Sequence, residues 1–405
     1  MKKIVGTIAA IALATSAVFA DVNVGMGFSR AIWTPFAYDG NDARMDISTS
    51  WGVQPRIGAS ISGASDECGV VADMKFDGGN VAVNDNAYVW VKPISWLKIN
   101  IGQSFDGTLR GNACYGMWDW LRVGGSTLDI STGELATATT VDTDKVGLVN
   151  VMTGEDFIFT RVCMNPLGGA YLPLVGTILM ADPIDGLHIA VGLPIDGYNN
   201  QKIEDVFKNI QVQAGYTIDG VGTIKAQYIG SKGTGTPGDA KEDDWAQIEA
   251  AFDLKAVEDM TLSVGAKFRT YEDAPIDVAA YWSMPFDALR VHASVGLTIA
   301  PKFMGGDDSL TTLVAGAGID YDLGNGLAVS ADVRFGKMFC SADGFDDSIA
   351  ADPAIAFGAW VNKGIANGTL GIGAQGAIRQ TIRDFTPSAY DDFSFAIPVR
   401  VQCFF

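Results

Sequence analysis

The amino-acid sequence predicts an all-β fold, a transmembrane antiparallel β-barrel of about 18 strands within a range of about 16 to 20. Three observations lead to this prediction. The chain begins with a segment typical of exported proteins, apolar and polar residues then alternate with a period of two, and short turns alternate with long polar loops. Together they indicate strands with one face against lipid and the other against water.

The first 20 residues have the composition of a signal peptide. "MKK" is followed by the apolar run "IVGTIAAIALATSAVFA" and then by the polar start "DVNVG". A positive end, a short apolar stretch and a small residue at the boundary predict cleavage after Ala20. The run falls short of the roughly 20 apolar residues that cross a bilayer as a helix. We therefore expect an exported protein whose barrel comprises residues 21–405.

Composition narrows the class of protein further. The chain has 28 Lys and Arg against 47 Asp and Glu, a net charge of −19, which argues against nucleic acid as a partner because nucleic-acid binding needs a basic surface. Yet the mean hydropathy is positive, at +0.18, and only 19% of the residues are charged. No segment after the signal peptide is long and apolar enough for a membrane-spanning helix. If the chain crosses a membrane, we expect it to do so with strands.

Alternation with a period of two is the main secondary-structure signal. In "LRVHASVGLTI" (residues 289–299) every odd-numbered residue is apolar, whereas the even positions carry Arg, His, Ser, Gly and Thr. "TLSVGAKFR" (261–269) and "LAVSADVRF" (327–335) alternate in the same way. One face of each strand is therefore apolar, and the other mixes glycine, hydroxyls and charge.

The connections between these strands separate a membrane barrel from a β-sandwich. Short turns lead into alternating strands in "ADPIDGLHIAVG", "MPFDALRVHASVG" and "DLGNGLAVSADV", and longer polar stretches such as "GSKGTGTPGDAKEDD" and "CSADGFDDSIAAD" lie between these units. Short turns at one end and long acidic loops at the other are typical of transmembrane barrels. A sandwich has no reason to segregate its loops so regularly, so we favour the barrel.

The alternation assigns individual strands. We predict them near 22–34, 52–63, 68–77, 86–92, 97–105, 172–181, 187–193, 209–217, 222–230, 245–254, 260–271, 277–284, 289–300, 311–321, 327–338, 355–362, 369–380 and 394–405. The stretch 106–171 is then one long loop, unless "DFIFTRVC" within it adds a hairpin. This loop either folds into the lumen as a constriction or stays outside as a binding surface.

Aromatic residues indicate where the strands meet the membrane surface. Tyr216, Trp282 and Tyr321 each fall on the apolar face shortly before a short turn. Amphipathic rings form girdles at the two interfaces of transmembrane barrels, so these three are expected in an aromatic girdle. The alternative is that aromatic residues simply favour strands.

The signal peptide, the repeated turn and strand units and the terminal "VRVQCFF" together resemble an outer-membrane β-barrel porin of diderm bacteria. "VGMGFSRAIWTPFA" and "NAYVWVKPISWLKINIGQSFDGTLRG" are similar to porin-like barrels of spirochaetes. The resemblance implies an outer-membrane location, and it implies that the last strand, ending in Phe405, is an assembly signal for the barrel assembly machinery. The backbone edge of that strand is expected to pair with "DVNVGMGFS", because a barrel in a membrane cannot leave an edge unpaired.

Several motifs bear on catalysis or cofactor binding. "GIGAQG" spells a dinucleotide-binding fingerprint, but it lies inside an alternating strand rather than between a strand and a helix. The two histidines, His188 and His292, occur in no HExxH or CxxC context. We therefore expect no cofactor, no metal site, no catalytic residues and no enzymatic activity. Among five cysteines, Cys114 and Cys163 bracket the most irregular stretch and are one candidate disulfide pair.

Charged residues on the polar face are the candidate functional residues. A charge on a wall that cannot face lipid must line water or pair with another group. The passage then favours anionic solutes, unless an inward-folded acidic loop neutralises the wall. The predicted pore-lining residues are Lys98, Lys225, Lys267, Arg269, Arg290, His292, Arg334, Arg379 and Arg400.

These observations predict a porin that forms a water-filled channel for passive diffusion of small hydrophilic solutes or ions. The alternative is a surface adhesin or receptor, in which the barrel is a scaffold for acidic outer loops. The expected partners are outer-membrane lipid, the diffusing solutes and the assembly machinery, and a homotrimer is an arrangement that the resemblance allows.

Overall fold

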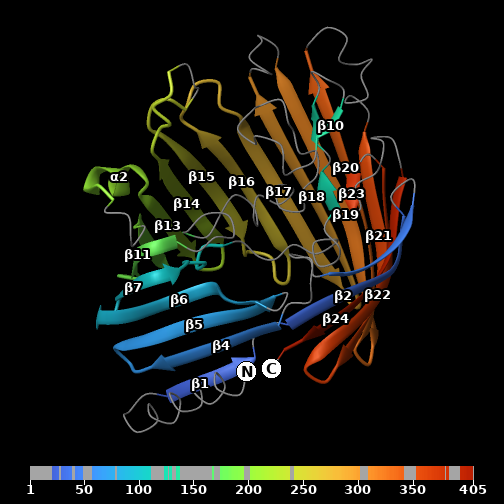
Figure 1. Cartoon of the computed structure of the whole chain (residues 1–405), viewed down its shortest axis with the longest axis horizontal. Helices are drawn as coiled ribbons and strands as arrows, with labels where there is room; N and C mark the ends of the chain where they lie inside the picture. The colour runs from blue at the N-terminus through green and yellow to red at the C-terminus, as the bar shows by residue number, and fades with distance from the viewer. Residues whose placement is uncertain are drawn as a thin grey trace.

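The structure of the chain is a computed structural model (Figure 1). It describes residues 21–26, 29–38, 42–48, 57–77, 80–110, 123–125, 127–129, 134–136, 167, 174–195, 201–237, 241–301, 309–341, 353–378, 380–382 and 393–404. The predicted signal peptide, Cys114, Cys163, Arg379 and Phe405 lie outside these residues. Within them, no helix is both long and apolar enough to cross a membrane. The helix α2 (Ile203–Lys208) has 6 residues.

One antiparallel sheet of 20 strands holds most of the described residues. Its first strands are β1 (Asp21–Met26), β2 (Ser29–Tyr38), β3 (Ala43–Ser48), β4 (Ile57–Ala64), β5 (Cys68–Asp77), β6 (Asn80–Ile94) and β7 (Leu97–Ser104). After a long connection follow β11 (Leu174–Ala181), β12 (Leu187–Pro194), β13 (Gln211–Ile218), β14 (Gly222–Ser231), β15 (Trp245–Leu254), β16 (Thr261–Arg269) and β17 (Ile276–Phe286). The last are β18 (Leu289–Ala300), β19 (Leu310–Gly324), β20 (Leu327–Cys340), β21 (Ala354–Ile365), β22 (Gly368–Ile378) and β24 (Phe393–Cys403). The predicted all-β antiparallel fold class is confirmed.

Each of the predicted strands has a counterpart in this sheet. Two differences raise the number of strands from about 18 to 20. The predicted strand 22–34 is divided into β1 and β2, and β3 was not predicted. The sequence of β3, "ARMDIS", is short and places Arg44 and Asp46 among its apolar residues, so it carries little alternation.

The seam of the sheet, where its N-terminal and C-terminal strands meet, differs from the prediction. The C-terminal strand β24 pairs with β2, from Ser29 opposite Cys403 to Tyr38 opposite Phe395, whereas β1 pairs with β4 instead. The expectation that "DVNVGMGFS" covers the edge of the last strand was therefore wrong for Asp21–Met26 and holds for Ser29. Within the described residues β1 pairs only with β4 and β3 only with β2, so the sheet is not closed by hydrogen bonds. The backbone N–H of Gly58 on β4 nevertheless donates to Ser29 Oγ at 3.3 Å, and Figure 1 shows β2 returning beside β4.

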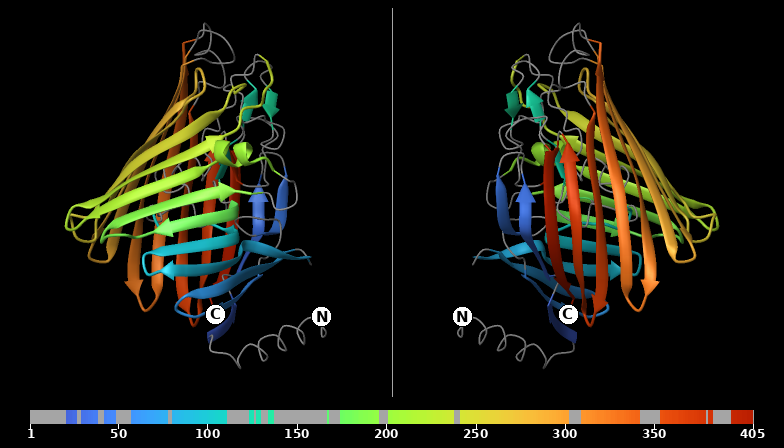
Figure 2. Two further views of the ribbon diagram at one scale, coloured as in Figure 1. Left: turned by 90° about the vertical axis from the view of Figure 1, so that its left-hand side faces the viewer. Right: turned by 90° about the vertical axis from the view of Figure 1, so that its right-hand side faces the viewer.

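The connections are largely segregated as predicted, although the connections from β5 to β6 and from β16 to β17, at the end of the long loops, are short. At one end of the strands lie short turns, at 65–67, 95–96, 182–186, 219–221, 255–260, 287–288, 325–326 and 366–367. At the other end lie the long connections between β7 and β11, β12 and β13, β14 and β15, β18 and β19, β20 and β21, and β22 and β24 (Figure 2). We call these the short-turn end and the long-loop end. The turn Asn325–Gly326 shows why the short turns close tightly, because both residues have positive φ, 54° and 72°. This is the conformation that a two-residue hairpin requires.

Part of the long stretch 106–171 is described. Two small pairings belong to it: β9 (Thr127–Asp129) pairs with β10 (Glu134–Ala136), and β8 (Val123–Gly125) pairs with β23 (Gln380–Ile382). β23 lies in the connection between β22 and β24. The stretch that follows β7 therefore reaches the C-terminal strands of the sheet through the pairing of β8 with β23. β23 contacts β22 and β24, so its pairing with β8 lies beside these strands (Figure 1).

Candidate functional site

The sheet buries polar side chains and exposes apolar ones. Charged residues with less than 9% exposure include Lys225, Arg334, Arg400 and Glu249. On the opposite face of the same strands, large apolar residues are open, for example Ile224 at 54% and Val333 at 47%. A water-soluble domain has the reverse arrangement. The inner face is therefore polar and the outer face apolar, as a strand between water and lipid requires.

The aromatic residues of the outer face lie toward both ends of the strands. Tyr216 and Tyr321, at 45% and 44% exposure, lie near the short-turn end, and Trp282 is partly buried on the same face. A second row lies toward the long-loop end and was missed in the sequence: Tyr228, Phe268, Phe339, Phe357 and Phe393 are each at least 40% exposed. Its members lie beside the connections at the long-loop end, either before or after them, whereas the sequence prediction considered only residues before short turns.

The spacing of these two rows matches the thickness of a membrane. Tyr321 pairs with Val329 of β20, and Phe339 follows ten residues later on the same strand. Ten residues span about 33 Å along a strand, or about 25 Å across the membrane at a tilt of about 40°. An apolar band of about 25 Å is typical of transmembrane barrels.

Acidic residues pair with the predicted basic residues on the inner face. Lys225 Nζ donates to Asp253 Oδ2 at 2.6 Å, and Ser263 Oγ donates to the other oxygen of Asp253 at 2.6 Å. Lys225 is 2% exposed. Such an enclosed pair needs both charges, because either one alone would remain buried without compensation.

Asp277 holds two further predicted residues. Its carboxyl Oδ2 lies 3.7 Å from Lys267 Nζ and accepts a hydrogen bond from Arg269 at 3.2 Å, while Oδ1 accepts from Thr298 at 2.6 Å. Asp277 was not among the candidate residues. The period-two pattern would have found it, because Lys267 and Asp277 are direct cross-strand partners on β16 and β17.

Four further predicted basic residues lie on β18, β20 and β24. Arg290 donates to Ser283 Oγ at 3.0 Å, and Arg400 donates to Asn362 Oδ1 at 3.1 Å. His292 and Arg334 are 5% and 6% exposed. The ring of His292 lies over Gly318 of β19, where an added Cβ would come within 2.4 Å of its Nε2. These residues share the inner face with Lys225 but form no single cluster with it.

Lys98 has a different environment from the other predicted lysines. Its Nζ lies 5.0 Å from the centroid of the Trp90 ring and 5.8 Å from that of Tyr88, both on β6. An ammonium group over an aromatic face is attracted to the ring quadrupole. Lys98 is therefore held by rings, whereas Lys225 and Lys267 are held by carboxylates.

The chain after β7 turns onto the inner face. Leu109 lies against Gly215 of β13, where an added Cβ would come within 2.4 Å of its side chain. Leu167 lies against Gly192 of β12 and joins a buried cluster with Leu174, Ile178 and Ala190. Asp106 and Leu167 form an isolated β-bridge, so two parts of this stretch that are far apart in sequence meet on the inner face. We call residues 105–110 the inner segment.

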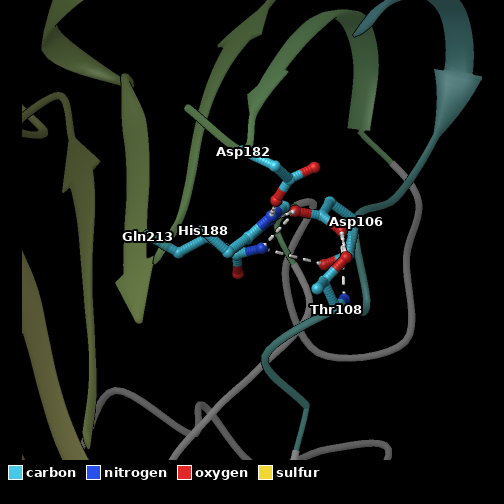
Figure 3. Close-up of polar contacts among 5 residues, drawn as sticks. All are labelled: Asp106, Thr108, Asp182, His188 and Gln213. Atoms are coloured by element: carbon cyan, nitrogen blue, oxygen red, sulfur yellow. Dashed lines mark hydrogen bonds and ion pairs between the residues drawn. The ribbon is translucent and has the colours of Figure 1, made fainter. Parts of the chain in front are cut away.

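Asp106 anchors the inner segment to two strands (Figure 3). Its Oδ2 lies 2.7 Å from His188 Nε2 on β12 and accepts a hydrogen bond from Gln213 Nε2 on β13 at 2.5 Å. Its Oδ1 accepts from Thr108 Oγ1 at 2.6 Å and from the Thr108 backbone N–H at 3.0 Å. Asp106 is 4% exposed, and both of its oxygens are hydrogen-bonded.

His188 contacts a second carboxylate on its other side. Its Nδ1 lies 2.7 Å from Asp182 Oδ1, in the turn between β11 and β12. A carboxylate can only accept hydrogen bonds, so both ring nitrogens donate and the imidazole carries a positive charge. Burial alone raises the pKa of Asp106, but hydrogen bonds from His188 and Thr108 outweigh it and hold that pKa below its usual value. The inner segment is thus fixed by an ionised pair.

Comparison with known proteins identifies the fold. No family model matches the chain, and no curated protein matches it by sequence. The anion-selective porin from Comamonas acidovorans matches with a TM-score of 0.51 and 9% identity, over 95% of this chain and 100% of that chain. The outer membrane protein OpdK from Pseudomonas aeruginosa also gives a TM-score of 0.51, with 11% identity over 95% of this chain and 98% of that chain. The chain therefore has the fold of outer-membrane β-barrel porins, as the sequence resemblance implied.

Proposed function

We propose that the chain is an outer-membrane channel through which small hydrophilic solutes or ions diffuse passively. The observation that carries the proposal is the inner face itself, on which charged side chains such as Lys225, Asp253 and Asp277 line the concave side of an apolar-coated sheet. Charges on such a wall are stable only beside water or beside one another. A polar inner wall and an apolar outer wall are what a water-filled pore through a bilayer requires.

The inner segment supports a passage that is narrowed rather than open. Barrels of 16 to 18 strands leave an aqueous channel, and this sheet has 20 strands. Asp106, Leu109 and Leu167 bring the chain onto the inner face of β11 to β13. We infer that this segment forms part of a constriction that filters solutes by size and charge.

The charge pattern supports a channel wall that carries both basic and acidic residues. Lys225, Lys267 and Arg269 share their charges with Asp253 and Asp277. The sequence left two alternatives open: a wall whose basic residues favour anionic solutes, or a wall whose basic residues are neutralised by an inward-folded acidic loop. Among the described residues, these three basic residues pair with acidic residues of the strands themselves. We propose that the paired residues create local fields across the passage and that Lys98, whose ammonium group lies over rings, contributes to ion preference.

The channel acts by diffusion down a gradient, without a covalent step. Its pore-lining residues are those predicted, namely Lys98, Lys225, Lys267, Arg269, Arg290, His292, Arg334 and Arg400, with Arg379 outside the described residues. We propose further that the protein is exported through a cleaved signal peptide and is inserted by the barrel assembly machinery. A homotrimer is part of the proposal, since the apolar outer face has room for neighbouring copies as well as lipid.

Planar-bilayer recording tests the function. Refolded protein of residues 21–405 should insert and give discrete conductance steps in simple salt. Protein that is folded, by its β-sheet circular dichroism and heat-modifiable migration, but gives no steps above background would overturn the channel. The adhesin alternative would then be tested by deleting residues 232–244. If the protein does not conduct and this deletion abolishes surface binding, the barrel is a scaffold for binding loops.

A further inference from the structure

Two lysines of the inner face lie over aromatic rings at β6 and β7. Lys98 Nζ is 5.0 Å from the Trp90 ring centroid and 5.8 Å from that of Tyr88, and Lys92 Nζ is 5.7 Å from the Trp90 centroid. We call Tyr88, Trp90, Lys92 and Lys98 the aromatic–lysine patch. It combines a flat apolar floor with two ammonium groups.

The patch belongs to the inner face. Trp90 pairs with Asn100, which is 2% exposed, whereas the alternate residues Val89 and Ile101 are 51% and 53% exposed on the outer face. Gly69 of β5 makes room for the Trp90 ring, because a Cβ at that position would lie 2.6 Å from the indole Nε1. The ring therefore lies flat across the neighbouring strand, and Trp90 and Tyr88 remain partly exposed.

The charge of the patch distinguishes it from the rest of the wall. Lys225, Lys267 and Arg269 each have a carboxylate partner. In the part of the chain that the structure describes, Lys92 and Lys98 have no ion pair, and their side chains contact rings instead. Two like charges over one ring repel each other, so an anion between them would relieve the repulsion.

Two acids near the patch are already engaged by other donors. Asp106 is bonded by His188, Gln213 and Thr108. Asp73, on β5 near Tyr88, accepts a hydrogen bond from Asn86 Nδ2 at 2.6 Å. Both carboxylates therefore have hydrogen-bond donors of their own, and neither forms an ion pair with Lys92 or Lys98 among the described residues.

We propose that the aromatic–lysine patch binds small organic anions with a flat apolar body, such as aromatic carboxylates, during their passage through the channel. The carboxylate lies between Lys92 and Lys98, and the flat body packs on Trp90 and Tyr88. An inorganic anion would use the lysines without the rings, and a neutral solute would use the rings without the lysines. The inference rests on the proposed channel function and names a substrate class for it.

Three probes separate these cases in bilayer recordings of the full barrel. Benzoate carries both a ring and a charge, acetate only the charge, and benzamide only the ring. Benzoate should reduce the conductance at a concentration about tenfold lower than acetate, since ring stacking contributes about one factor of ten in affinity. Benzamide should leave the conductance unchanged at the same concentrations.

Variants locate the binding to the patch. Lys98→Met should weaken the benzoate effect about tenfold, Lys98→Arg should preserve it, and Trp90→Leu should reduce benzoate to the level of acetate. The matched control is Lys241→Met, since Lys241 Nζ also lies over two rings, 5.2 Å from Trp245 and 5.3 Å from Tyr271, at the long-loop end. This control should leave the benzoate effect unchanged. If Lys98→Met does not fold, Lys92→Met at the more exposed lysine replaces it.

The outcomes distinguish the inference from the function it rests on. A folded protein that gives no channel overturns both. An open channel that responds equally to benzoate and acetate, or whose benzoate effect survives both Lys98→Met and Trp90→Leu, overturns the inference and leaves the channel in place. An equal loss in Lys241→Met would also overturn it, because the binding would then not depend on the patch.

Discussion

Asp106 Oδ2 lies 2.7 Å from His188 Nε2, although the two residues are 82 positions apart in the chain. This contact joins the connection that follows β7 to the inner face of β12, and Gln213 adds a hydrogen bond from β13. It decides the path of residues 105–110, which run along the wall instead of continuing outward from the strand.

Removing the charge of His188 should release the inner segment. His188→Ala leaves the ionised Asp106 buried without its partner, which costs about 3–5 kcal/mol when one member of a buried pair is removed. The segment can avoid that cost by leaving the wall. We expect a larger single-channel conductance and more current noise than in the unchanged protein, measured in planar bilayers.

Asp182→Asn is the control for this variant. Asp182 contacts the same ring, but its side chain is 66% exposed, and exposed pairs contribute little to stability. Its conductance should stay close to that of the unchanged protein. Equal conductance in His188→Ala and the unchanged protein would show that the contact does not hold the segment.

Acid should have the same effect as the His188 substitution. The pKa of Asp106 lies below its usual value in the folded state, so its contribution to stability is complete above the ordinary aspartate pKa of about 3.9. It is lost as the pH falls through the lower folded value. We expect conductance to be constant from about pH 7 to about pH 5 and to rise below about pH 4. Asp106→Asn should remove most of this acid-dependent step, and an unchanged step in that variant would assign it to another group.

The pair Lys225 and Asp253 should stabilise the sheet. Lys225→Met leaves Asp253 enclosed without its partner, and we expect a loss of about 3 kcal/mol in the free energy of unfolding. Urea unfolding in lipid vesicles, followed by tryptophan fluorescence, measures this change. Adding Asp253→Asn to Lys225→Met should recover part of the loss, because no uncompensated charge remains. Additive losses in the double variant would argue against a coupled pair.

Charge reversal at Lys267 and Arg269, the two basic partners of Asp277, should change ion preference. Lys267→Glu together with Arg269→Glu replaces two partners of Asp277 with carboxylates and leaves a cluster of acids on the inner face. The reversal potential in a salt gradient should shift toward cations. Lys241→Glu, at the long-loop end, is the control for a change of charge alone. An unchanged reversal potential in the first variant would place these side chains outside the conducting path.

Deleting Phe405 should impair insertion before it affects conductance. The resemblance to outer-membrane porins implies that the terminal aromatic residue is recognised by the assembly machinery. The last strand, β24, is paired with β2 up to its final residue, because Cys403 lies opposite Ser29. Cell fractionation should show less protein in the outer membrane, while the molecules that do insert give normal conductance steps. Deletion of Phe405 with normal insertion would contradict the assembly role.

Local sequence was sufficient for most of the fold. A strand with one face in water and one in lipid must alternate polar and apolar residues. The pattern in residues 289–299 therefore predicted the first residue of β18 correctly. Turn chemistry such as Asn325–Gly326 located the hairpins, because it depends only on neighbouring residues. The break between β1 and β2 was not predictable in this way, since it depends on which distant strand pairs with each half.

The charges of the inner face show the same division. Period-two counting placed Lys225, Lys267 and Arg269 on the polar face, and the structure buries or half-buries each of them there. Their partners Asp253 and Asp277 come from neighbouring strands, so only the pairing register brings them together. Counting bases alone therefore overstated the positive charge of the wall.

The sequence by itself determined that this protein is a barrel-forming sheet with an apolar outer face and a polar inner one, because that choice depends on residues one and two positions apart. Tertiary structure alone decided which charges neutralise one another, where the seam lies and where the chain after β7 turns inward. Asp106 lies 82 positions from His188 and 107 positions from Gln213 in the chain. Their meeting depends on strand order and register, which bring distant segments to one place and which no local pattern encodes.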